Sequence, residues 1–263
     1  MNSQNIYDDN EFFRLYSILN SKPNGAPDSI PTFRFLEKIK STKTQPKIQC
    51  VLELACGNGW FSNYMATKEN VKSVRAFDLS ENMLDLAKRI HSHPVISYEL
   101  ADMETIQLPN QSFDLGFSSL ALHYVLNFKS LVQSIHQSLN PGGHFFAIIE
   151  HPIYTAPTVR EWIPNTQDPP STGSCNMTRG EMIWPLYDYQ VEGDRVVDWI
   201  VNGVLKRHRT MSTYLNIFMD CGFDIRGIEE FSPPTMELNN TVHLEIDRHR
   251  PKFLILSVQK HIE

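Results

Sequence analysis

The chain has 263 residues, a formal net charge of −6 and 41% hydrophobic residues, which suits one α/β domain, with or without an insertion. It has no basic run, so broad binding to nucleic acid or to an anionic membrane is not expected, and no stretch reaches the roughly 20 apolar residues of a membrane span. The first residues show no apolar signal core, and the four cysteines form no Cys-x-x-Cys pair. We therefore expect a cytoplasmic protein with reduced thiols. The only close histidine pair precedes a proline in an expected loop, and no metal site is predicted.

Residues 1–45 are expected to form a helical cap before the sheet. A first helix is predicted within residues 6–20, where apolar residues recur at helical spacing, including Phe12 and Tyr16. A break rich in proline and glycine follows, and a second helix is predicted from Pro31 to Lys40, with the proline in its first turn.

Strand and helix patterns then alternate through residues 46–150. The expected strands are Gln49–Leu54, Val71–Phe77, Val95–Leu100, Phe113–Phe117 and His144–Ile149. Helices are expected over Asn58–Lys68, from Ser80 to Ile90 and before Leu139, and a turn over Asn140–Gly143. Alternation of this kind predicts a parallel sheet with right-handed crossovers, whose ligand lies beyond the carboxyl ends of the strands.

The first strand runs into a turn of small residues, written Glu53-x-Ala55-x-Gly57-x-Gly59. The glycines permit close approach of a ligand to the backbone, and the following helix offers free N–H groups. The Gly-x-Gly-x-x-Gly pattern of a dinucleotide site is absent. We expect Glu53 to face the cleft, where a carboxylate would repel a pyrophosphate but suit an ammonium or sulfonium ligand.

This turn resembles motif I of the class I S-adenosylmethionine-dependent methyltransferases, with Ala55 in place of the usual first glycine. The runs Leu108–Asp114 and Asn140–His144 resemble segments of the type 11 branch, and the resemblance covers residues 48–150 in register. It implies a Rossmann-like sheet of seven strands in the order 3-2-1-4-5-7-6, with the seventh strand antiparallel. It also implies S-adenosylmethionine as cofactor.

The resemblance assigns cofactor contacts to the residues that follow the strands. Asp78 would bind the ribose hydroxyls, although an acidic residue there could also serve only as a helix start. Asp102 and Met103 would bind adenine, with Leu79 and Met83 over its other face. The full set of expected cofactor-binding residues is Tyr16, Glu53, Ala55, Gly57, Gly59, Asp78, Leu79, Met83, Asp102, Met103 and Ser118.

Residues 151–208 exceed what the core fold needs, and we interpret them as a lid over the acceptor site. A decorative or dimerising flap is the alternative. Pro164–Gly180 is expected to be a mobile loop, and a hairpin is predicted with Trp184–Val191 and Arg195–Val201 on either side of Glu192-Gly193-Asp194. Residues 209–263 should then complete the core with a helix over Thr210–Cys221 and strands over Phe223–Glu230 and Phe253–Gln259.

The predicted activity is methyl transfer to an O, N or C atom of a small organic molecule. His123 and His151 follow strand ends and are the candidate bases. Candidate acceptor-binding residues are Tyr124, Tyr154, Trp184, Tyr187, His208 and Arg209, the last as a bidentate partner for a carboxylate or as a surface ion pair.

Several rival functions stay open at this point. A nicotinamide-dependent oxidoreductase is disfavoured by the missing glycine pattern. A protein or RNA methyltransferase, or a non-catalytic protein that binds the cofactor, would use the same cofactor residues. The chain is expected to be a monomer or a homodimer.

Overall fold

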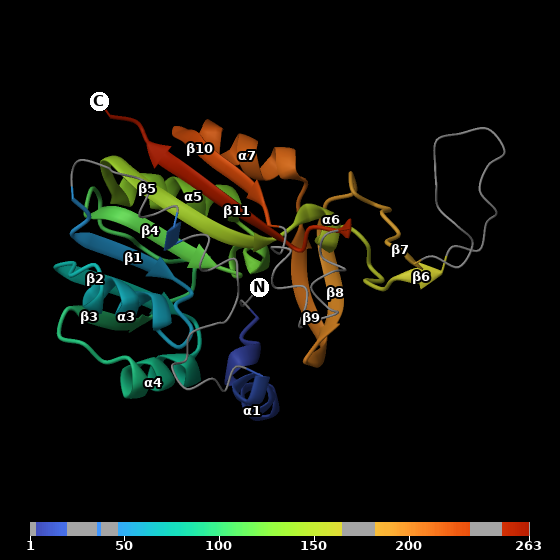
Figure 1. Cartoon of the computed structure of the whole chain (residues 1–263), viewed down its shortest axis with the longest axis horizontal. Coiled ribbons are helices and arrows are strands. Elements are labelled where there is room, and N and C mark those ends of the chain that lie inside the picture. The colour runs from blue at the N-terminus through green and yellow to red at the C-terminus, as the bar shows by residue number, and fades with distance from the viewer. Residues whose placement is uncertain (1–3, 20–35, 38–46, 165–181, 232–248, 263) are drawn as a thin grey trace.

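The computed structural model describes residues 4–19, 36–37, 47–164, 182–231 and 249–262 (Figure 1). Its helices are η1 (Ile6–Asp8), α1 (Asn10–Leu19), α3 (Trp60–Thr67), α4 (Glu81–Ile90), η2 (Leu122–Tyr124), α5 (Phe128–Ser138), α6 (Pro152–Thr155) and α7 (Met211–Asp220). Its strands are β1 (Cys50–Leu54), β2 (Ser73–Asp78), β3 (Ile96–Leu100), β4 (Phe113–Ser119), β5 (Leu139–Glu150), β6 (Ile163–Pro164), β7 (Met182–Ile183), β8 (Gly193–Trp199), β9 (Val201–His208), β10 (Phe223–Glu230) and β11 (Phe253–Lys260). None of the helices in these ranges has the length and apolar character that a membrane span requires.

Seven strands form one sheet in the order β3-β2-β1-β4-β5-β11-β10. The pairs among β1 to β5 are parallel, whereas β11 runs antiparallel to both of its neighbours. The predicted order 3-2-1-4-5-7-6, with an antiparallel seventh strand, is confirmed. The carboxyl ends of β1, β2, β4 and β5 therefore meet at one edge of the sheet.

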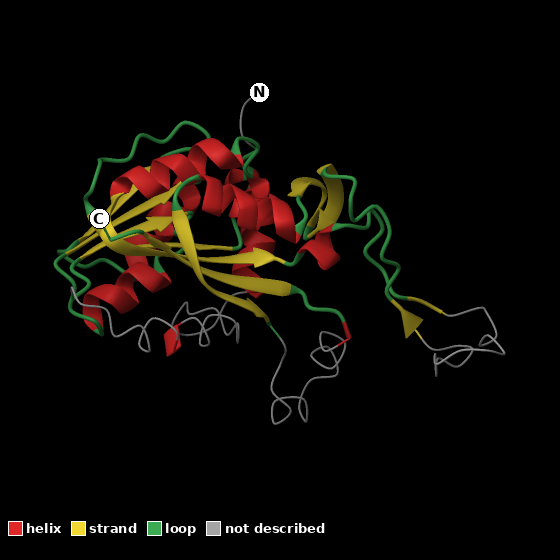
Figure 2. Cartoon of the chain, turned by 90° about the horizontal axis from the view of Figure 1, so that it is seen from above, coloured by secondary structure: helices red, strands yellow, loops and turns green. Residues whose placement is uncertain are grey.

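Apolar residues on both faces of the sheet account for its position at the centre of the molecule. One core cluster joins inward residues of β1, β4, β5 and β11 to α5 and α7, and a second joins the opposite faces of the strands to α3 and α4. Figure 2 shows helices on both faces of the sheet. Every residue of β5 from Gly142 to Glu150 is buried, so this strand lies in the interior of the molecule.

The predicted turn at Asn140–Gly143 proves to be an irregularity within β5. The pairing with β4 jumps from Phe113 opposite Leu139 to Leu115 opposite His144, so the extra residues bulge out of the ladder. The Asp114 carboxylate accepts hydrogen bonds from Asn140 Nδ2 at 2.8 Å and from the backbone N–H groups at the start of β1. This shared acceptor holds the bulge against β1.

The hairpin of the insertion lies one strand later than predicted. β8 pairs with β9, and the chain reverses at Ile200, which has a φ of 63°. Glu192, expected in the turn, instead accepts hydrogen bonds from Thr210 N and Oγ1 at 2.7 and 2.8 Å, and so fixes the start of α7. Figure 1 shows the hairpin beyond the carboxyl ends of β4 and β5. The predicted loop Pro164–Gly180 and most of the helix predicted over Pro31–Lys40 lie outside the described residues.

Candidate active site

The turn after β1 has the backbone geometry of a ligand-binding loop. Ala55, Gly57 and Gly59 have φ values of 56°, 53° and 77°, all in the left-handed region. A Cβ added at Gly59 would collide with the Tyr98 ring of β3, whereas one at Gly57 would meet no atom within 4 Å. Gly59 is therefore required for packing behind the turn, and Gly57 leaves open space on the side where a ligand would approach.

Asp78 organises the same turn from the end of β2. Its Oδ2 accepts a hydrogen bond from Gly57 N at 2.7 Å, and its Oδ1 accepts one from Ser80 N at 2.9 Å. Burial raises the pKa of Asp78, although the N–H donors of Ser80 and Gly57 oppose this effect. The backbone N–H of Leu79 is a third donor to Asp78. Because a carboxylate offers about four acceptor sites, Asp78 retains capacity for one ribose hydroxyl.

The structure does not support the expected orientation of Glu53 toward the cleft. Its side chain is 4% exposed, and Oε2 accepts hydrogen bonds from Ser62 N at 3.0 Å and from Ser62 Oγ. Burial raises the pKa of Glu53 to about 8, against the opposing hydrogen bonds of Ser62. Glu53 thus secures β1 to α3, and at neutral pH it is poorly suited to balance a ligand cation.

The other expected cofactor residues divide into two groups. Asp102 and Met103 lie on the turn after β3, where Asp102 Oδ1 accepts a hydrogen bond from Glu104 N at 2.9 Å. Ser118 lies beside Leu54 at the end of β4, and its buried Oγ has no hydrogen-bond partner. Met83, in contrast, is only 2% exposed within α4, so its packing is that of a core residue.

The N-terminal segment lies against the residues that follow β2. Asp8 Oδ1 accepts hydrogen bonds from Ser80 Oγ at 2.5 Å and from Asn82 N at 3.1 Å, while Asn5 Nδ2 donates to Leu79 O at 3.2 Å. The negative charge of Asp78 contributes, after burial, to a raised pKa of Tyr16. These contacts bring Tyr16, a predicted cofactor residue, into the neighbourhood of the predicted ribose-binding carboxylate.

Aromatic rings connect this segment to the hairpin. Trp199 of β8 packs edge-on against Phe12 and Tyr7, with ring centroids 5.6 and 6.4 Å apart, and against Tyr16 at 6.5 Å. Tyr7 also hydrogen bonds to Tyr124 of η2, whose pKa is raised by burial. Elements from the two ends of the sequence therefore meet beyond the carboxyl ends of β2 and β4.

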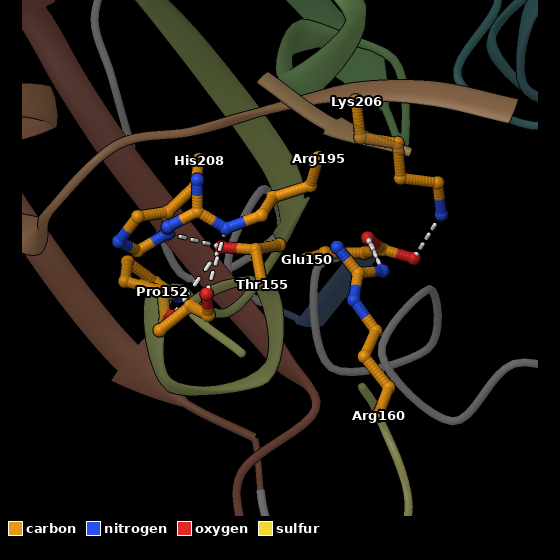
Figure 3. Close-up of polar contacts among 8 residues, drawn as sticks. Glu150, Pro152, Thr155, Arg160, Arg195, Lys206 and His208 are labelled. Carbon is orange, nitrogen blue, oxygen red and sulfur yellow. Dashed lines mark hydrogen bonds and ion pairs between the residues drawn. The ribbon is translucent and has the colours of Figure 1, made fainter. Parts of the chain in front are cut away.

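A buried ionic group completes this region. Lys206 Nζ of β9 lies 2.5 Å from Glu150 Oε1, and Arg160 Nη1 lies 3.3 Å from Glu150 Oε2 (Figure 3). Lys206 Nζ also lies 5.0 Å from the centre of the Trp199 ring and 5.7 Å from that of Tyr124. We call Tyr7, Tyr124, Glu150, Arg160, Trp199 and Lys206 the strand-end cluster.

The pKa values of both Glu150 and Lys206 are lowered, which favours the charged form of the carboxyl group but the neutral form of the lysine. Burial alone would raise the pKa of Glu150, but His123, Lys206 and Arg160 lower it to about 2. Burial also lowers the pKa of Lys206, because desolvation outweighs its attraction to Glu150. The carboxylate has two cations around it, whereas each cation has one carboxylate, so the ionised state of Glu150 is the better supported.

His123 is enclosed beside this cluster. It is 1% exposed, and its Nδ1 is buried without a hydrogen-bond partner. Burial lowers the pKa of His123 to about 3, with only Glu150 opposing the shift. The imidazole is therefore neutral at physiological pH and keeps an uncommitted ring nitrogen, but a pKa of about 3 makes it a weak base in the ligand-free protein.

The other predicted base has a structural role. His151 caps α6, because its Nδ1 accepts a hydrogen bond from Ile153 N at 3.1 Å, and its Nε2 lies 2.9 Å from Glu230 Oε1. His208, predicted to bind the acceptor, is likewise engaged at both nitrogens, with Thr155 Oγ1 at 2.8 Å and Tyr189 O at 2.9 Å. Neither ring has a nitrogen left for catalysis.

Arg209 also differs from its predicted role. Its Nη2 donates to the carbonyls of Val125 and Leu126, and its guanidinium lies over the rings of Phe128 and Tyr214. These contacts attach the end of β9 to α5 and are not a surface ion pair. They use Nη2, while Nη1 is buried without a hydrogen-bond partner.

The aromatic residues predicted to bind the acceptor occupy different surroundings. Only Tyr124 joins the strand-end cluster. Tyr154 stacks on Trp184 at 5.8 Å beside Arg160, whereas Tyr187 is 38% exposed and hydrogen bonds to Thr158 and Val159. Tyr187 therefore lies at the surface instead of facing an acceptor.

Sequence reasoning missed Tyr7, Glu150, Arg160, Trp199 and Lys206 as site residues. Glu150 alone carried a usable signal, because it directly follows a buried strand. The others are brought together by the path of the N-terminal segment and the hairpin, which no local pattern reveals.

Comparison with known proteins agrees with this geometry. A family model described as "Methyltransferase domain" matches residues 52–147. The solved S-adenosylmethionine-dependent methyltransferase from Mesorhizobium loti is 37% identical, with a TM-score of 0.74 over 85% of this chain and 96% of that one. An uncharacterised Haemophilus influenzae protein is 28% identical over 98% of both chains. A malonyl-[acyl-carrier protein] O-methyltransferase from Erwinia billingiae is 33% identical over 41% of each chain. With this fold and this degree of similarity, the chain belongs to the class I S-adenosylmethionine-dependent methyltransferases.

Proposed function

We propose that this methyltransferase modifies an O, N or C atom of a small organic molecule that binds beside the strand-end cluster. When bound, S-adenosylmethionine supplies a methyl group activated by its sulfonium centre. The residues present fit this cofactor: the turn is open at Gly57, Asp78 has spare acceptor capacity, and Ser118 Oγ lacks a partner. We place the cofactor along the turn after β1, with its ribose at Asp78 and its adenine near Asp102 and Met103.

His123 is the single observation that carries the proposal for the acceptor side. Its Nδ1 is buried without a hydrogen-bond partner in η2, the first element after β4. A neutral imidazole at this point can accept the proton that a hydroxyl or amine nucleophile loses. Aromatic residues around it would position the acceptor, and positioning alone removes a large entropic barrier to a two-substrate reaction.

The relative that modifies malonyl-[acyl-carrier protein] resembles this chain over only 41% of its length. That similarity concerns a methyltransferase core and is a weak guide to the acceptor. We therefore favour a free small molecule, since Tyr7 of the N-terminal segment, Tyr124 of η2 and Trp199 of the hairpin gather in this region.

Two measurements test the proposal. S-adenosylhomocysteine at about 100 times its dissociation constant should stabilise the protein by about 2.7 kcal/mol, while NAD should not. Formation of S-adenosylhomocysteine should then be followed by mass spectrometry with a panel of small acceptors, using wild-type protein and His123→Gln. We expect the variant to bind S-adenosylhomocysteine normally but to turn over any hydroxyl or amine acceptor at least about 100-fold more slowly. Cofactor binding without turnover of any acceptor would instead favour a non-catalytic binding protein.

A further inference from the structure

One edge of the Arg160 guanidinium is buried without a hydrogen-bond partner. The side chain is 10% exposed, and Nη1 interacts with Glu150 Oε2 at 3.3 Å. Nε and Nη2, which form the other edge of the guanidinium, are buried and have no hydrogen-bond partner. Buried polar groups are nearly always paired in native proteins, so an unpaired N–H edge calls for a ligand.

Another arginine of this chain shows what the same edge binds. Arg75 uses Nε and Nη2 to hold Glu99, with distances of 2.8 Å to Oε1 and 2.6 Å to Oε2. These two N–H groups lie in one plane and match the two oxygens of a carboxylate. The unpaired edge of Arg160 has the same shape and the same donors.

The local charge favours an anion. Arg160 and Lys206 share one carboxylate, that of Glu150, which is the only acidic group recorded in an ion pair with either cation among the described residues. Arg209 and Lys252 add positive charge nearby, as their effects on the pKa values of His123 and Lys206 indicate. The region thus holds an excess of positive charge in a setting where desolvation is unfavourable for unpaired ions.

This edge also lies close to the proposed base. The positive charge of Arg160 contributes to the lowered pKa of His123, after burial and the larger effect of Lys206. The guanidinium lies 5.1 Å from the centre of the Tyr154 ring, which fixes its plane (Figure 3 shows Arg160 and Lys206 on two sides of Glu150). A ligand held by Arg160 would therefore lie near His123 and Tyr124.

We propose that the methyl acceptor carries a carboxylate group and that Arg160 binds this group side-on through Nε and Nη2. Lys206 adds the charge that Glu150 does not neutralise. This inference rests on the proposed function and narrows its acceptor to organic acids. It also moves the carboxylate-binding role from Arg209, whose Nη2 donates to backbone carbonyls, to Arg160, whose Nε and Nη2 both lack a hydrogen-bond partner.

The test compares acids with their amides on protein loaded with S-adenosylhomocysteine. Acetate, benzoate and hexanoate are titrated calorimetrically beside acetamide, benzamide and hexanamide, which have similar shapes but no charge. We expect at least one acid to bind about tenfold or more tightly than its amide, since hydrogen bonds between charged groups are the strong ones. The inference is wrong if no acid binds better than its amide.

Three variants test whether Arg160 causes the preference for an acid over its amide. Arg160→Gln should abolish the preference for the acid, and Arg160→Lys, which keeps the charge but loses the two-donor edge, should weaken acid binding about tenfold. Arg89→Gln, which removes an exposed arginine of α4, should bind the acid like the wild type. Unchanged acid binding by Arg160→Lys would contradict the side-on contact.

Binding of S-adenosylhomocysteine to each variant separates the two proposals. If the wild-type protein fails to bind it, the proposed function fails. If the wild type and all variants bind it equally, but the wild type shows no preference for an acid over its amide, the Arg160 site alone is refuted.

Discussion

Ala55 is the residue of the cofactor turn at which the chain departs from its family motif. Its backbone conformation leads to a prediction about stability. Its φ of 56° lies in the left-handed region that glycine adopts readily. For a residue with a Cβ this conformation costs roughly 1–2 kcal/mol, because the Cβ approaches the following carbonyl oxygen. Replacing Ala55 with glycine should remove that strain.

The expected magnitude is modest because glycine also gives the unfolded chain more freedom. That entropy offsets roughly 0.5–1 kcal/mol of the benefit. The net stabilisation of Ala55→Gly should therefore be about 0.5–1 kcal/mol. For a chain of this size, the melting temperature should rise by about 1–4 °C.

A second alanine supplies a matched control. Ala66 lies inside α3 and is 4% exposed, so the same change there should destabilise the protein by about 1 kcal/mol. Both variants are compared with the wild type by urea unfolding and by calorimetric melting. If Ala55→Gly is as destabilising as Ala66→Gly, the left-handed conformation assigned to Ala55 is wrong.

The remaining predictions concern individual charged groups. Asp78→Ala should weaken binding of S-adenosylhomocysteine by about 1.5–3 kcal/mol in a protein that still unfolds cooperatively. Unchanged affinity by calorimetry would mean that Asp78 stabilises the turn but does not bind the cofactor. Glu150→Gln should destabilise the fold by about 3–5 kcal/mol, because it leaves two buried cations unpaired. Lys206→Met should cost less, because Glu150 keeps its ion pair with Arg160. Equal losses of stability in urea unfolding would contradict this difference. The folded-state pKa of His123 is about 3, below an unfolded value near 6.5, so its contribution to stability is complete above about pH 6.5 and is lost as the pH falls toward 3. His123→Gln should reduce the pH dependence of unfolding between about pH 6 and 4 by up to about 1.4 kcal/mol per pH unit, and identical slopes for the two proteins would refute a buried neutral imidazole.

The sheet could be predicted because its signals are local. Each strand of the core is a short apolar run that ends in a polar or small residue, and Ser80 caps α4 as expected by accepting a hydrogen bond from Met83 N. The antiparallel seventh strand came from family resemblance, because no pattern in Phe253–Lys260 reveals its direction. The strand-end rule also placed Asp78 and His151 at this edge of the sheet, where the structure has them.

The contacts of side chains at this edge could not be predicted in the same way. Glu53 follows the motif, yet its carboxylate turns toward Ser62, nine residues later, instead of toward a ligand. Tyr7 and Trp199 are almost two hundred residues apart in the sequence, and the spacing of neither residue indicates a contact. A sequence pattern specifies which face of an element is buried, but it does not specify which distant segment covers that face.

The histidines of the insertion show why residue type alone is a poor guide to catalysis. His151 follows the most buried strand and precedes a proline at the first position of α6, and this arrangement makes it a helix cap. His208 ends the buried face of β9 and pairs with Thr155, while Arg195 from β8 donates to Ala156 O at 2.7 Å. These contacts tie the hairpin to α6 and thereby hold Lys206, on the same face of β9, against Glu150. The insertion thus contributes Arg160, Trp199 and Lys206 to the site, and the contact of His208 with Thr155 helps to hold the hairpin in place.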